Sequence, residues 1–212
     1  MSIVHTVPRN AQFTSIGDAC LTGGGAYCDV LEFWFDIIWT SKTQLALRSK
    51  TLHINLMEFI VVVLQLAAVI LILVEEPALY KPLHQHFPTG IPALAHLLIR
   101  TDNSPSRNWA HKVSAKSEKG QLFVSIYADL LERSTLAISC NLFAGKSNDL
   151  ADFISRPPLP IPPPLTRRTQ ISTKEPRLAS YRFSTRVPSS YRSLPRGYTP
   201  NNDRQARLCQ SP

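Results

Sequence analysis

Four acidic residues lie where a carboxylate could do chemistry, namely Asp18, Glu58, Asp102 and Asp152. Asp102 has the clearest setting, because it closely follows the short apolar run 94–99, which is typical of a buried strand. In α/β proteins the chemistry lies at the C-terminal ends of such strands. Carboxylate oxygens are the ligands that hard divalent cations prefer, whereas acids packed together without a cation repel one another. The four acids therefore indicate a divalent cation site, provided that the fold brings them together.

The elements around these acids follow from local signals. After Asp102, Ser104 offers an N-cap hydroxyl and Pro105 suits the first position of a helix, because its missing N–H would have no partner there. Asp18 lies at the end of a predicted first strand that begins at 13–16. The glycines at 23–25 are predicted to form the turn of a hairpin. They do not indicate a phosphate-binding loop, because no Gly-Lys-Ser/Thr follows them.

Residues 55–74 form the most apolar segment and carry Glu58 near their start. Apolar side chains recur at helical spacing, with Asn55 as a plausible N-cap. Between 60 and 74 only Gln65 is polar, which gives 15 residues, fewer than the roughly 20 that span a bilayer. A helix that is apolar all round can also be the buried helix of an α/β domain. We expect the buried helix, and keep a single-pass membrane protein using residues 56–74 as the alternative.

The rest of the first 156 residues reads as alternating strands and helices, so we predict an α/β fold. The further predicted elements are strands at 26–35, 37–40 and 136–143 and helices at 106–112, 121–133 and 149–155. A loop rich in proline and histidine is expected between 80 and 92, and a turn at 144–147.

The charge divides the chain into two parts. Residues 1–152 carry 12 basic and 13 acidic residues, a net charge of −1, whereas 153–212 carry 11 basic and 2 acidic residues, a net charge of +9. The second part also holds 11 of the 17 prolines, which block helix and sheet formation. We therefore predict a domain at 13–156 and a disordered Pro/Arg/Ser-rich tail at 157–212. Such a tail either binds phosphate backbones or is simply solvated.

The cysteines Cys20, Cys28, Cys140 and Cys209 include no C-x-x-C pair. Neither a zinc site nor a disulfide framework is indicated. The N-terminus lacks the layout of a secretory signal. We expect a reducing compartment, cytoplasmic or nuclear.

Four motifs occur in order along the chain: DACLTGGG at 18–25, NLME at 55–58, TDN at 101–103 and AGKSNDLADFISR at 144–156. Each contains one of the four acids. Together they resemble the ribonuclease H domain of retrotransposon reverse transcriptases, over residues 13–156. Each motif alone is weak, but four in series with matching secondary structure are fairly specific.

The resemblance implies a mixed five-stranded sheet with flanking helices, and acids that hold two Mg²⁺ ions, or Mn²⁺, to cleave the RNA strand of an RNA–DNA hybrid. It implies that Asp18 bridges both ions, that Glu58 binds the ion on the leaving-group side, that Asp102 orients the attacking water and that Asp152 completes the second site. A reverse transcriptase polymerase domain outside this chain is an implied partner. No membrane partner is expected.

One departure from the family concerns turnover. The family usually has a histidine two residues before the Ala-Gly turn, and this chain has Leu142 there. An inactive relic that binds nucleic acid therefore remains an alternative to the active nuclease. Lysines near the acids could line the phosphates of a hybrid or form a solvated face; they are Lys112, Lys116, Lys119 and Lys146.

Overall fold

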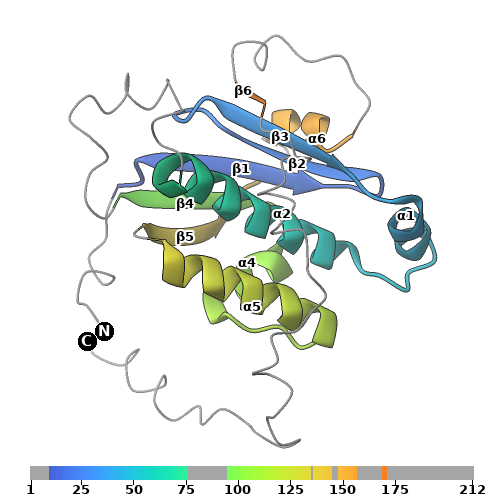
Figure 1. The fold of residues 1–212 in the computed structure, drawn as a ribbon. Coiled ribbons are helices and arrows are strands. Elements are labelled where there is room, and N and C mark those ends of the chain that lie inside the picture. Colours follow the sequence, from blue (N-terminus) through green and yellow to red (C-terminus); the bar gives the residue numbers. More distant parts are fainter. Residues whose placement is uncertain (1–9, 76–94, 135, 145–147, 157–168, 171–212) are drawn as a thin grey trace, which may run out of the picture.

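A computed structural model of the chain describes residues 10–75, 95–134, 136–144, 148–156 and 169–170. Its centre is one sheet with strand order β5-β4-β1-β2-β3-β6 (Figure 1). The strands are β1 (Phe13–Ala19), β2 (Gly23–Cys28), β3 (Phe33–Ile38), β4 (His96–Thr101), β5 (Ala137–Leu142) and β6 (Thr169–Gln170). β1, β2 and β3 pair antiparallel, whereas β4 lies parallel to β1 and β5 parallel to β4. The predicted α/β class with a mixed sheet and flanking helices is confirmed.

Helices cover both faces of the sheet. They are α1 (Ser41–Arg48), α2 (Ile54–Ile70), α4 (Ser104–Lys112), α5 (Glu118–Arg133) and α6 (Asp149–Ile154), and a π-helical turn at Leu71–Glu75 continues α2. α2 packs on β1, β2 and β4 and also contacts α4 and α5, whereas α6 packs on β1 and β2. The main core lies under α2. A smaller core lies on the other face, where Ile16, Tyr27 and Trp34 meet Ala151 and Ile154.

The three glycines lie in β2 and not in a turn, so the prediction of a glycine turn is wrong. The chain reverses at residues 20–22, where Cys20 N donates to Gly23 O at 2.8 Å. A Cβ on Gly24 would lie 2.6 Å from Val61 of α2, and a Cβ on Gly25 would overlap Ile154 of α6. Because neighbouring strand residues point to opposite faces, these glycines let one helix approach closely on each side.

The aromatic run 26–35 is two strands and not the single predicted strand. β2 ends at Cys28 and β3 begins at Phe33. The turn between them contains Glu32, with a φ of 49°, and the fully buried Leu31. The turn residues 29–32 include two acids, Asp29 and Glu32, so the break lies at charged residues inside an otherwise apolar run. The strand predicted at 37–40 is the end of β3, and α1, which follows it, was not predicted.

The helix predicted at 55–74 is confirmed as α2 and its π-helical turn, although His53 and not Asn55 is its N-cap. The segment Ile54–Leu73 is long and apolar enough to cross a membrane, and 94% of its most apolar window is buried inside the fold. Every residue from Leu56 to Ile70 is buried. This packing is that of a core helix, and it favours the buried helix over the single-pass alternative.

The remaining elements lie within three residues of their predicted bounds. β4 ends directly before Asp102, and Asn103 caps α4 in place of the predicted Ser104: its Oδ1 accepts from Ser106 N at 2.9 Å. α5 begins at Glu118, three residues before the predicted start, with Ser117 as its cap. The loop predicted at 80–92 and residues 145–147 of the predicted turn lie outside the described residues.

A short strand comes from the segment that we expected to be a disordered tail. Thr169 and Gln170 form β6, which pairs in parallel with Phe33 and Trp34 of β3. At these two residues the expectation of disorder is wrong. The other residues of 157–212 lie outside the described part of the chain.

Gln65 generates a prediction about stability. It is fully buried in α2 with its amide over Gly17, and neither amide atom has a hydrogen-bond partner among the described residues. Because an unpaired buried amide is costly, Gln65→Met should raise the free energy of unfolding by about 1–2 kcal/mol, measured by chemical denaturation. The exposed Gln121→Met is the control and should not stabilise, because it removes a bond to Ala115 N. A less stable Gln65→Met variant would contradict the prediction.

Candidate metal centre

Three of the four predicted acids meet at one end of the sheet. Asp18, Glu58 and Asp102 each offer a carboxylate oxygen, and these oxygens all lie within 4.8 Å of one another. Asp18 is the penultimate residue of β1, Asp102 follows β4 directly, and Glu58 is the fifth residue of α2. The site therefore joins two neighbouring strands and the helix that covers them.

The strand register sets Asp18 and Asp102 at the same level. Ile16 of β1 pairs with Arg100 of the parallel β4, and each acid lies two residues beyond that pair. The helix contributes Glu58 through its spacing, because Glu58, Val61 and Gln65 lie at i, i+3 and i+7 and share one side of α2. Val61 and Gln65 pack over Gly17 of β1. The side of α2 that faces the sheet thus carries Glu58 and Gln65, the two buried polar residues of the helix.

Hydrogen bonds tie the start of α2 to the start of α4. Asn103 Nδ2 donates to Asn55 Oδ1 at 3.1 Å. The buried Ser106 Oγ lies 3.2 Å from Asn55 O and 2.9 Å from Asn103 Oδ1, and either oxygen can accept its single proton. Asn55 lies three residues before Glu58, and Asn103 follows Asp102. These bonds therefore fix Glu58 and Asp102 relative to each other.

Burial raises the pKa of all three carboxyl groups. Burial, with the charges of Asp18 and Asp102 adding to it, raises the pKa of Glu58 to about 9. Burial also raises the pKa of Asp18 to about 6, although a hydrogen bond from Ser155 opposes this shift. Asp102 is exposed, but partial burial of its carboxyl group raises its pKa as well, and the charge of Asp152 adds to this.

Ser155 links the site to α6. It is fully buried, and its Oγ donates to Asp18 Oδ2 at 2.9 Å. Cys20 Sγ donates to Ser155 O at 3.0 Å. From the sequence, Ser155 was placed only at the end of a helix. The signal that could have found it was its position three residues after Asp152, which puts it on the same side of α6.

Asp152 is the predicted site residue that the structure does not bring into the group. Its Oδ1 lies 2.5 Å from Nη2 of Arg156, and both side chains are partly exposed. Asp152 is still near the site, because its charge raises the pKa values of Asp18 and Asp102. It therefore lies at the rim of the three-acid group.

The three acids fit a divalent cation. Glu58 is only 5% exposed, and its Oε2 has no hydrogen-bond partner among the described residues. None of the three carboxylates has an ion-pair partner in that part of the chain. A bound cation would satisfy Glu58 Oε2 and remove the repulsion between the acids, and oxygen ligands suit hard cations. Asp18, Glu58 and Asp102 could thus bind a metal ion.

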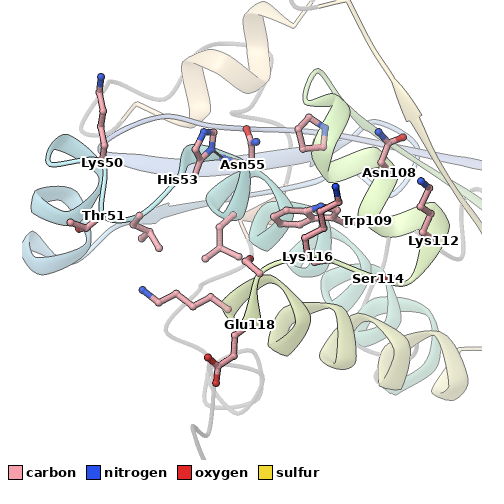
Figure 2. Close-up of a pocket in the computed structure, with 16 residues that line it drawn as sticks. Lys50, Thr51, His53, Asn55, Asn108, Trp109, Lys112, Ser114, Lys116 and Glu118 are labelled. Carbon is pink, nitrogen blue, oxygen red and sulfur yellow. Dashed lines mark hydrogen bonds between the residues drawn. The ribbon is translucent and has the colours of Figure 1, made fainter. Parts of the chain in front are cut away.

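A basic groove of about 860 Å³ lies at the starts of α2 and α4, and none of the three acids is among the residues that line it. It runs from the connection between α1 and α2 across the start of α2 to α4 and the start of α5 (Figure 2). Its charged and histidine side chains are Lys50, His53, Lys112, Lys116, Glu118 and Lys119. Figure 2 shows Lys50 on one side of the groove and Lys112 on the other, with Trp109 and Lys116 between them. Asn55, which is bonded to Asn103 beside Asp102, also lines it.

Of the predicted nucleic-acid contacts, the structure places Lys112, Lys116 and Lys119 at this groove, and all three are exposed. Lys146 lies outside the described residues. Lys50, which comes from a different part of the chain, was not singled out from the sequence. Trp109 also packs edge-on against Phe59, with ring centroids 5.5 Å apart.

No protein-family model matches the chain, and no match was found among curated proteins or solved structures. The chain's own fold and side chains define it as an α/β protein with a candidate metal centre.

The raised pKa of Glu58 predicts how stability depends on pH in metal-free protein. Between its ordinary value of 4.5 and about 9, the folded state holds a proton that the unfolded state has lost. The free energy of unfolding should therefore fall as pH rises from 6 to 9, by at most about 1.4 kcal/mol per pH unit for this group. Denaturant titrations in the presence of a chelator measure this slope.

Two matched variants test whether Glu58 causes this dependence of stability on pH. Glu58→Gln should flatten it, because an amide does not titrate in this range, whereas Glu132→Gln at an exposed position of α5 should leave it unchanged. Equal slopes in the wild type and Glu58→Gln would contradict the assignment.

Proposed function

We propose that this chain is a ribonuclease H-type hydrolase derived from a retrotransposon reverse transcriptase, which cleaves the RNA strand of RNA–DNA hybrids with two Mg²⁺ ions. Mn²⁺ would replace Mg²⁺. The observation that carries the proposal is the meeting of Asp18, Glu58 and Asp102 at the ends of two parallel strands. These are three of the four acids that the sequence resemblance selects, and they come from three separate motifs.

The order of the elements supports the same proposal. The antiparallel strands β1, β2 and β3 come first, followed by α2, the parallel strand β4, α4 and α5, the parallel strand β5 and finally α6. Asp18 lies on the first strand and Asp152 on the last helix, as the resemblance implies, and Asp102 directly follows β4. Glu58 departs from the expected first helix, because α1 precedes α2 and makes α2 the second helix.

The burial of each site residue indicates its role in the proposed reaction. When bound, the divalent cations would stabilise the entering and departing oxygens of phosphodiester hydrolysis. Asp18 and Glu58 are buried, so they would act as the inner ligands. Asp102 is exposed at the rim. It would bind a cation and orient the attacking water. Ser155 would hold Asp18 through its Oδ2.

The groove at the starts of α2 and α4 suits a nucleic-acid backbone. Four lysines and one acid line it, and lysines bind phosphates through charge and counterion release. Lys112 and Lys116 would contact phosphates of a hybrid whose RNA strand passes the acids. The net charge of +9 in residues 153–212 would add affinity that does not depend on nucleic-acid sequence.

A second candidate function is binding of nucleic acid without cleavage. Leu142 stands where the family usually has a histidine, and it is exposed at the end of β5. Asp152 is paired with Arg156 and not with the other acids. Both observations favour an inactive relic that keeps the groove and the basic tail.

Cleavage of a labelled RNA–DNA hybrid in Mg²⁺ tests the proposal. The full chain should cut the RNA strand, and Asp102→Asn should reduce the rate by about 100-fold or more, because it removes a charged ligand without removing bulk. Asp129→Asn on α5 is the matched control and should cut normally. Metal-independent cleavage, or equal rates for the wild type and Asp102→Asn, would contradict the proposal, and hybrid binding without cleavage would favour the relic.

Hybrid binding in Ca²⁺ or without metal tests the groove. Replacing Lys112 and Lys116 together by Gln should weaken binding and reduce the slope of log K against log salt by about one for each phosphate that is no longer neutralised. Lys42→Gln on α1 removes a lysine that does not line the groove and should leave the slope nearly unchanged. A slope that is unaffected by the groove lysines would assign binding to the tail alone.

A further inference from the structure

Arg156 directly follows α6 and its terminal Ser155, and its guanidinium reaches back to Asp152 at a distance of 2.5 Å. We propose that Arg156 is the counter-ion of Asp152, so that the chain binds one cation tightly at Asp18, Glu58 and Asp102 and a second only when Arg156 is displaced. This inference rests on the proposed metal-dependent function and concerns how that site is filled.

The first cation position is complete without Asp152. The oxygens of Asp18, Glu58 and Asp102 lie within 4.8 Å of one another. An independent observation also points to a ligand there. Only 5% of Glu58 is exposed, and its Oε2 has no hydrogen-bond partner among the described residues. A tight cation is therefore expected at this position first.

One oxygen of Asp152 and one of Asp18 already have partners. Oδ1 of Asp152 holds Arg156, and Oδ2 of Asp18 accepts from Ser155. When all three acids of the group are ionised, the first divalent cation neutralises two of their three negative charges. Because Arg156 neutralises Asp152, little negative charge remains to attract a second cation.

The size of the effect follows from the exposure of the pair. About 61% of the Arg156 side chain and 45% of the Asp152 side chain are accessible. An exposed ion pair at i, i+4 spacing shifts an equilibrium by about two-fold, and up to about five-fold when its geometry is good. Arg156 thus weakens the second site without abolishing it.

Binding of Mn²⁺ alone to the full chain tests this, with bound and free ion distinguished by electron paramagnetic resonance. The wild type should bind one ion tightly and a second weakly. Arg156→Gln should tighten the second site by about two- to five-fold and leave the first within about two-fold. Arg156→Lys keeps the charge and should resemble the wild type. Arg133→Gln, at the exposed end of α5, is the control for loss of a positive charge elsewhere.

A double variant tests whether the tighter second site of Arg156→Gln depends on Asp152. Combining Asp152→Asn with Arg156→Gln should remove the gain and leave the first site in place. Two equally tight ions in the wild type, or an unchanged second site in Arg156→Gln, would overturn the role of Arg156 while leaving the proposed function standing. If no Mn²⁺ bound to the wild type, both proposals would fall.

Discussion

The close approach of α2 to the sheet is the constraint on which the site depends. Val61 packs where Gly17 and Gly24 have no side chain, and a Cβ at either position would collide with it. Glu58 is one helical turn before Val61 on the same side, so the contact that seats the helix also brings this carboxylate to Asp18. With larger residues at 17 and 24 the helix would move outward, and the three oxygens would separate.

Packing must therefore offset the cost of burying acids. Glu58 and Asp18 are among the few buried charged residues in the described structure, and their raised pKa values are a measure of that cost. The same helix buries every residue from Leu56 to Ile70, and each large apolar side chain contributes about 1.5–3 kcal/mol. The packing of α2, a helix apolar enough to cross a membrane, thus keeps two carboxylates in the interior.

The sequence was most informative where local periodicity and chemistry agree. The apolar repeat of α2, the Ser-Pro start of α4 and the strand before Asp102 were all visible, and they placed Glu58 and Asp102 correctly, whereas the strand predicted from residue 13 placed Asp18. The glycines of β2 were misread because the reason for them lies in Val61 and Ile154, which are remote in sequence. Asp152 was grouped with the other acids by resemblance, whereas its nearest partner is Arg156, at a spacing that favours a local ion pair. The spacing of Ser155 from Asp152 points only to the same side of α6, whereas its partner Asp18 is remote in sequence.

Trp39 gives the site an intrinsic optical reporter. Its indole N–H donates to the carbonyl of Cys20 at 2.9 Å, in the turn that follows Asp18, and its ring packs beside Gly24. Indole emission responds to nearby charge and to the strength of this hydrogen bond. A change of charge among the acids should thus alter the emission of Trp39, which adds to that of Trp34 and Trp109.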